Sequence, residues 1–143
     1  MTYGRNPMFE KGKSQNIVAV NRIYKLLKAR DLSGILDLLS QDVRITQSIE
    51  LPWGGTWAGI AEARMFFEKM WVYVDNRPIV ERFLDGGDHI VALGRSYITV
   101  SRTGRTFEVP FAHVWGFRDG TVYRVEMIPE VAAMREVLES LDS

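Results

Sequence analysis

Two polar side chains that could do chemistry, His113 and Gln47, fall on patterns that predict the buried face of a β-strand. Alternation with a period of two places His113 on one face with Phe111, Trp115 and Phe117. In an earlier segment the same alternation places Gln47 among branched aliphatic side chains. Because apolar surroundings disfavour the charged imidazolium, we predict a neutral His113 ring that can accept one proton and donate another.

Each of these two groups also has a purely structural interpretation. A buried histidine is often satisfied by a neighbouring backbone or hydroxyl group. Burying the Gln47 amide without partners costs about 1 to 3 kcal/mol, so a ligand, His113, an ordered water or a loop must supply its hydrogen bonds. Since an amide is not a base at ordinary pH, Gln47 can orient a substrate but cannot abstract its proton. The sequence leaves both interpretations open.

The composition excludes several other chemistries. The 143 residues contain no cysteine and two histidines, His89 and His113, on different predicted strands. We therefore expect no thiolate nucleophile, no metal and no cofactor. Basic and acidic side chains number 18 each, which gives no field to attract nucleic acid or an anionic membrane. Residues 1–13 are polar and basic, unlike a secretory signal, and no segment is apolar enough to span a bilayer, so we expect a cytoplasmic protein.

Two further polar residues have other expected roles. His89 follows a turn at Asp88 and is expected at the surface. Arg95, on the strand after His89, either anchors a ligand carboxylate or pairs with an acid at the surface or at a subunit interface.

Helical spacing of apolar residues dominates the first half of the chain. Ser14 can cap a helix whose inner side carries Ile17, Val20, Tyr24 and Leu27. Three further helices are predicted: one capped by Asp31 and reaching Leu39, one over residues 60–71, and one over residues 131–141.

A period of two marks the predicted strands. They cover residues 43–49, 78–84, 89–102, 105–118 and 121–128. Residues 52–59, with three glycines and two tryptophans, are expected to form a loop. Helices followed by a curled antiparallel meander predict one α+β domain, with the helices on the concave side of the sheet.

Three segments resemble the SnoaL-like polyketide cyclase and ketosteroid isomerase superfamily, which has the nuclear transport factor 2-like fold. They are Ala29-Arg30-Asp31-Leu32-Ser33-Gly34-Ile35 through Asp42-Val43, Pro52-Trp53-Gly54-Gly55-Thr56-Trp57-Ala58-Gly59, and Gly104-Arg105-Thr106-Phe107-Glu108-Val109-Pro110-Phe111-Ala112-His113-Val114-Trp115 through Asp119-Gly120. The resemblance implies a cone-like fold, in which three or four helices pack on a strongly curved antiparallel sheet that encloses a cavity. It also implies a hydrophobic small-molecule ligand and a homodimer. The expected organisation is an N-terminal arm, residues 1–13, and a single SnoaL-like domain, residues 14–143.

The family's catalytic acids do not carry over to this chain. The resemblance places the isomerase base at Gln47, its oxyanion tyrosine at Ile23, its oxyanion aspartic acid at His113 and the cyclase acid at Met127. Tyr24 is one position from the tyrosine, which rotates it by about 100° around the helix and makes it a poor substitute. The resemblance extends to limonene epoxide hydrolase, which uses two aspartates and an arginine. The strand pattern does not place such a set on one inner face, so epoxide hydrolysis is not expected.

These observations predict a small-molecule pocket protein in which His113, backed by Gln47, acts on an apolar carbonyl substrate. If it is an enzyme, cofactor-independent isomerase- or cyclase-type acid–base chemistry is favoured over lyase or hydrolase chemistry. The alternative is non-catalytic binding of a hydrophobic ligand, or a dimerisation module. The predicted ligand-binding residues are Tyr24, Trp53, Trp57, Phe66, Phe111, Trp115, Tyr123, Val125 and Met127.

Overall fold

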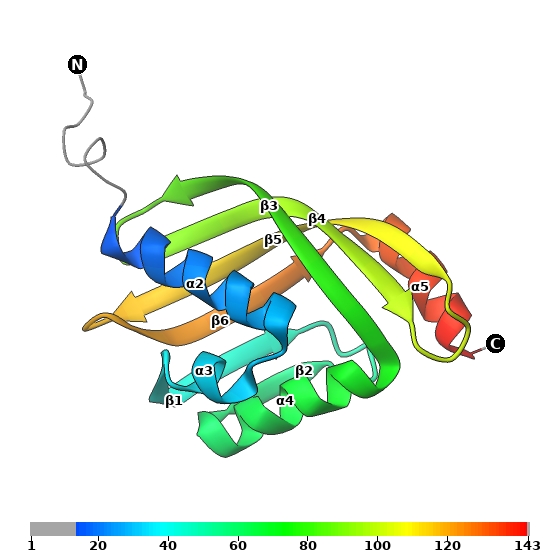
Figure 1. The fold of residues 1–143 in the computed structure, drawn as a ribbon, viewed down its shortest axis with the longest axis horizontal. Coiled ribbons are helices and arrows are strands. Elements are labelled where there is room, and N and C mark those ends of the chain that lie inside the picture. Colours follow the sequence, from blue (N-terminus) through cyan, green and yellow to red (C-terminus); the bar gives the residue numbers. More distant parts are fainter. Residues whose placement is uncertain (1–13, 143) are drawn as a thin grey trace.

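Residues 14–142 are described by a computed structural model, in which four helices pack on one six-stranded sheet (Figure 1). The helices are α2 (Gln15–Ala29), α3 (Leu32–Leu36), α4 (Gly59–Tyr73) and α5 (Val131–Asp142). The strands are β1 (Leu39–Gln47), β2 (Gly55–Ala58), β3 (Val74–Asp85), β4 (His89–Val100), β5 (Thr106–Arg118) and β6 (Thr121–Pro129). The predicted arm, residues 1–13, and Ser143 lie outside the described residues. Between Ser14 and Asp142 no helix is long and apolar enough to cross a membrane.

The two N-terminal helices begin where their capping residues predict. The Ser14 hydroxyl accepts a hydrogen bond from the Ile17 amide at the start of α2, and Asp31 accepts one from the Gly34 amide at the start of α3. Arg30, in the left-handed region at φ 55°, ends α2 and turns the chain directly into α3.

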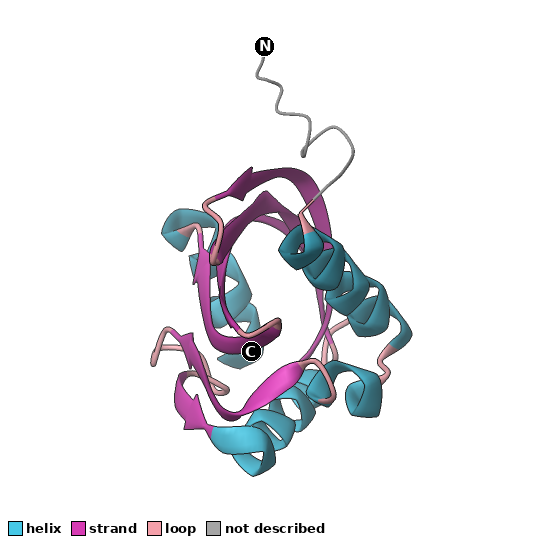
Figure 2. Cartoon of the chain, turned by 90° about the vertical axis from the view of Figure 1, so that its left-hand side faces the viewer, coloured by secondary structure: helices cyan, strands magenta, loops and turns pink. Residues whose placement is uncertain are grey.

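The sheet has the strand order β2-β1-β6-β5-β4-β3. Strands β3 to β6 form the predicted antiparallel meander. The sheet is nevertheless mixed, because β1 runs parallel to β6. In Figure 2 it curls around an interior that α2, α3 and α4 close on the concave side, and Figure 1 shows α5 at one end of the sheet. The α+β cone-like class is thus confirmed.

Three boundaries differ from the sequence expectation. Leu39 opens β1, opposite Val122, instead of ending the second helix. The first strand ends at Gln47, and Ile49 is 84% exposed, because a hydrogen bond from the Leu51 amide to the Ser48 carbonyl turns the chain there. Part of the expected loop 52–59 is strand β2, which pairs antiparallel with β1.

Candidate functional site

His113 lies in the middle of β5, between Ala92 of β4 and Met127 of β6. Its side chain faces the interior and is 7% exposed. The imidazole stacks on the Phe111 ring, with a centroid separation of 4.0 Å and an interplanar angle of 18°. Phe111, His113 and Trp115 share the inner face because strand side chains alternate, as the sequence pattern predicts.

A hydrogen-bonded network connects His113 to helix α2. The Tyr24 hydroxyl lies 2.7 Å from Nδ1 of His113, and the Trp115 indole donates to the same hydroxyl oxygen at 3.1 Å. Tyr24 and Trp115 also meet edge to face, at 5.6 Å between centroids. The sequence analysis named Tyr24 as a ligand-binding residue and did not predict this bond; its side chain is buried and is the hydrogen-bond partner of His113.

Burial keeps this network uncharged. Desolvation lowers the pKa of His113 from 6.5 to about 3, so the ring is neutral at physiological pH. Desolvation also raises the pKa of the Tyr24 phenol far above its ordinary value, although the hydrogen bond from Trp115 acts in the opposite direction. The site therefore offers neutral hydrogen-bonding groups rather than a charged acid or base.

Gln47 is the last residue of β1, and its side chain is 8% exposed. No side chain or backbone group within residues 14–142 is recorded as a hydrogen-bond partner of its amide. Since a buried amide without partners is costly, this group is placed to bind something that enters the fold.

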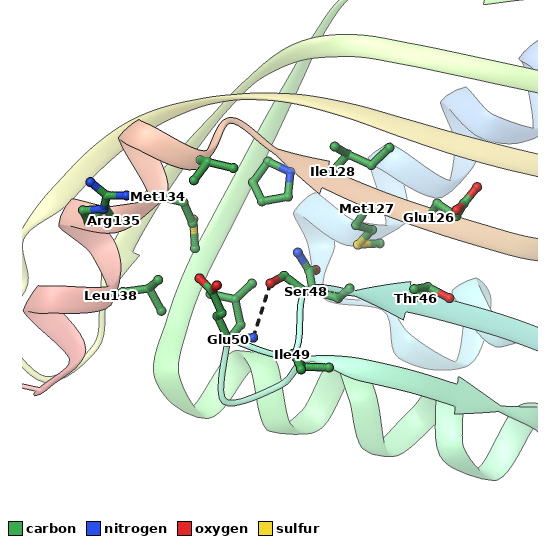
Figure 3. Close-up of a pocket in the computed structure, with 14 residues that line it drawn as sticks. Thr46, Ser48, Ile49, Glu50, Glu126, Met127, Ile128, Met134, Arg135 and Leu138 are labelled. Carbon is green, nitrogen blue, oxygen red and sulfur yellow. Dashed lines mark hydrogen bonds between the residues drawn. The ribbon is translucent and has the colours of Figure 1, made fainter.

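Two neighbouring cavities share Gln47 as a lining residue. The inner one, of about 40 Å³, is lined by His113, Phe111, Trp53 and nearby residues of β3, β4 and β6. The outer one, of about 610 Å³, lies between the β1–β2 loop, the end of β6 and helix α5 (Figure 3). Both are lined by Gln47, Leu51, Met127, Ile128, Pro129 and Met134. A small inner cavity therefore lies next to a larger outer one.

The inner cavity has four polar side chains on a largely apolar wall, which is the usual composition of a small-molecule site. They are Gln47, Asn76, Ser96 and His113. The Ser96 hydroxyl donates a hydrogen bond of 2.6 Å to Oδ1 of Asn76. The sequence reasoning missed Asn76 and Ser96. Ser96 could have been found, because it interrupts the apolar inner face of β4 in the way that His113 interrupts that of β5.

The predicted ligand-binding residues divide into two groups. Trp53, Phe111 and Met127 line the inner cavity, and Met127 also lines the outer one. Five others lie along neither cavity: Tyr24 and Trp115 form the network beside His113, Trp57 packs on Phe66 at 6.1 Å, and Val125 is buried opposite Trp115.

Tyr123 also lies along neither cavity, although alternation along residues 121–128 predicts that it shares a face with Val125 and Met127. Its ring contacts His89 and the Arg118 guanidinium, at 6.4 Å and 4.8 Å. The cause is a register shift between Gly116 and Phe117, which interrupts the pairing of β5 with β6 and breaks the alternation assumed for residues 123–127.

The remaining candidates pair with acids away from the cavities. Arg95 is exposed and bonds Glu108 and Glu81 across neighbouring strands. His89 pairs with Asp88 at 2.9 Å, and this hydrogen bond lowers the pKa of the Asp88 carboxyl. Across the described part of the chain, no group of three His, Asp or Glu side chains is arranged to hold a metal ion.

Comparison with known proteins identifies relatives over most of the chain. A family model described as a SnoaL-like domain matches residues 20–125. An NTF2-like protein of unknown function from Burkholderia pseudomallei is 31% identical, with a TM-score of 0.81 over 87% of this chain and 98% of that chain. TerC, co-crystallised with polyporic acid, is 30% identical, with a TM-score of 0.80 over 88% and 99%.

More distant structures share the fold alone. A Mycobacterium tuberculosis protein in complex with estradiol-17β-hemisuccinate is 19% identical, with a TM-score of 0.72 over 84% of this chain and 97% of that chain. No curated protein matches the chain.

Proposed function

This chain belongs to the SnoaL-like family, and on that premise we propose that it binds an apolar small molecule with its carbonyl group next to His113. The observation that carries the proposal is the inner cavity, which is lined by the neutral His113 ring and by the buried Gln47 amide, a group without a hydrogen-bond partner among residues 14–142. A ligand whose apolar body fills the outer cavity could extend one oxygen to these groups.

The ligands of two structural relatives support this ligand class. TerC was co-crystallised with polyporic acid, a hydroxyquinone with aromatic substituents, and the M. tuberculosis protein is in complex with a steroid ester. Both compounds combine an apolar ring body with oxygen functions at its edge. We propose the same kind of ligand for this chain.

The proposed chemistry is polarisation of the carbonyl by a hydrogen bond from neutral His113. Such a bond stabilises the negative charge that develops on the oxygen during enolisation, the step shared by isomerase- and cyclase-type reactions. Non-catalytic binding is the second candidate, and a specific observation favours it. No carboxylate lines the inner cavity within the described residues, so no strong base faces the substrate there.

A pair of α5 variants tests the binding site. Met134 lines both cavities, whereas Glu136 is an exposed residue of the same helix and lines neither. We expect Met134→Trp to weaken the binding of aryl ketones and hydroxyquinones at least about tenfold by filling the cavity, and Glu136→Trp to leave it unchanged. Isothermal titration calorimetry measures both, with thermal unfolding as the control for folding. Equal affinities in the wild type and Met134→Trp would show that the ligand does not bind in these cavities.

Deuterium uptake separates catalysis from binding. For a bound ketone in D₂O, a catalyst accelerates exchange at the carbon next to the carbonyl, and NMR measures the rate. We expect acceleration by the wild type and a loss of about 10²-fold or more in His113→Asn, as for the removal of one well-placed donor. Binding without acceleration would establish the non-catalytic alternative.

A further inference from the structure

The number of hydrogens available in the Tyr24 network restricts how the His113 ring is protonated. The Trp115 indole nitrogen can only donate, so the Tyr24 oxygen must accept its bond. The one hydrogen of the Tyr24 hydroxyl is then available to Nδ1 of His113, which lies 2.7 Å away. A nitrogen that accepts this hydrogen carries none of its own, and the proton of the neutral ring must be on Nε2.

The other tautomer would leave a buried hydrogen without a partner. With its proton on Nδ1, His113 would donate to Tyr24, whose oxygen would accept from both the indole and the imidazole. The Tyr24 hydroxyl hydrogen would then have no recorded acceptor among residues 14–142, in a side chain that is itself buried. His113 lines the inner cavity, where water or a ligand can accept from Nε2–H, whereas Tyr24 lines neither cavity, so the network favours the Nε2–H form.

The Asn76 and Ser96 pair adds a second donor to the inner cavity. Because Ser96 donates its hydroxyl hydrogen to Oδ1 of Asn76, the amide presents its NH₂ as the group without a recorded partner. Nε2–H of His113 and this NH₂ both require an acceptor.

We infer that Tyr24 is a positioning residue that fixes neutral His113 as an Nε2–H donor, so that the inner cavity selects a ligand oxygen that accepts hydrogen bonds, such as a carbonyl or an enolate. The ligand selectivity of the inner cavity rests on the proposed function, whereas the position of the proton on the His113 ring does not. An ammonium, which can only donate, would face these two donors and find the carbonyl oxygen of Gln47 as its side-chain acceptor, so it would bind less tightly than a ligand that accepts hydrogen bonds.

The ring state can be measured without any ligand, by ¹⁵N NMR of histidine-labelled protein at neutral pH, since protonated and bare ring nitrogens resonate far apart. We expect the His113 proton on Nε2 in the wild type. Tyr24→Phe should raise the Nδ1–H population at least about tenfold, because the bond that held Nδ1 bare is gone. Trp115→Phe is the matched control: it also removes one bond of the network but leaves the Tyr24 donor, so Nε2–H should persist.

A wild-type His113 that carries its proton on Nδ1 would overturn the assignment, and so would a Tyr24→Phe variant with unchanged nitrogen shifts. If Tyr24→Phe does not fold, the wild-type spectrum still decides the assignment, because a proton on Nδ1 would make Tyr24 the acceptor rather than the donor.

Selectivity is tested with two probes of one shape, 2-acetonaphthalene and 1-(2-naphthyl)ethylamine. We expect the ketone to bind the wild-type protein at least about tenfold more tightly than the ammonium, and this ratio to fall in Tyr24→Phe. Equal affinities for the two probes would refute the selectivity. Failure of both probes and of the wider ketone panel would refute the proposed function and the selectivity together, while the NMR result would stand separately.

Discussion

The buried, neutral His113 should lower the free energy of unfolding in mild acid. The size of this decrease follows from the difference between the pKa of the ring in the folded and unfolded chain. The pKa of the ring is 6.5 in a model peptide and about 3 in the fold. Below pH 6.5 the unfolded chain therefore binds a proton that the folded chain does not, so stability falls as the pH drops from 6.5 towards 3. Integration of this difference predicts that His113 alone removes about 2 kcal/mol between about pH 7.5 and about pH 5.

His113→Asn is the variant that isolates this effect. An asparagine places its carbonyl oxygen near the position of Nδ1, where it can still accept the hydrogen bond from Tyr24, but it does not titrate. Urea unfolding at about pH 7.5 and about pH 5 gives the pH-dependent loss of stability for each protein. We expect this loss to be about 2 kcal/mol smaller in His113→Asn, even though the variant is less stable than the wild type at neutral pH.

The other titrating groups contribute equally to the loss of stability in the wild type and in His113→Asn, so subtracting one loss from the other removes their contribution. Hydrogen bonds from Ser40 and Arg118 lower the pKa of Asp42, and the bond from His89 lowers that of Asp88, so both carboxyls cost stability only in stronger acid. An equal loss in the wild type and His113→Asn would show that the folded ring titrates like a free one. The neutral donor at the inner cavity would then be refuted.

Three further predictions concern the scaffold. Gly54→Ala should destabilise the fold by about 1 to 3 kcal/mol in thermal or urea unfolding, because its Cβ would lie 1.8 Å from the Ser48 carbonyl oxygen in the loop that borders both cavities. Ser14→Ala should cost about 1 kcal/mol by removing the hydrogen bond to the Ile17 amide, and it should leave ligand affinity unchanged. The expected homodimer through the outer face of the sheet predicts that Leu93→Asp lowers the mass measured by light scattering to that of a monomer, and a monomeric wild type would contradict that interface.

Local periodicity was sufficient to find two of the four polar groups of the inner cavity, and the same signal was present at Ser96. His113 and Gln47 were recognisable because one polar residue interrupts an apolar alternation, and the structure buries both. The caps at Ser14 and Asp31 were equally local signals, since each needs only an oxygen acceptor within three residues of the first helical amides.

The features that sequence reasoning missed depend on pairing between distant segments. The parallel pairing of β1 with β6 and the short strand β2 are set by tertiary contacts rather than by local pattern. The bulge at Gly116 moved Tyr123 away from the cavities in the same way. The bond from Tyr24 to His113 joins a helix to a strand 89 positions away, and helical geometry alone could not predict this contact.

The resemblance places Gln47 and His113 at the positions of the isomerase acids, and these two groups limit the kind of catalysis that the proposed site can support. Ionised carboxylates at these buried positions would need a partner to offset their desolvation, whereas an amide and a neutral imidazole need only hydrogen bonds. Both groups therefore remain in their working states across the physiological pH range without any counter-ion. Hydrogen bonds can stabilise developing charge but cannot take a proton, so a substrate held in the inner cavity must give its proton to solvent or to Glu50 or Glu126, the carboxylates of the outer cavity. An aryl ketone loses its α-hydrogen more readily than a simple alkyl ketone, whereas the acidic proton of a hydroxyquinone is on oxygen, so deuterium uptake at carbon is a test to be made with the aryl ketones.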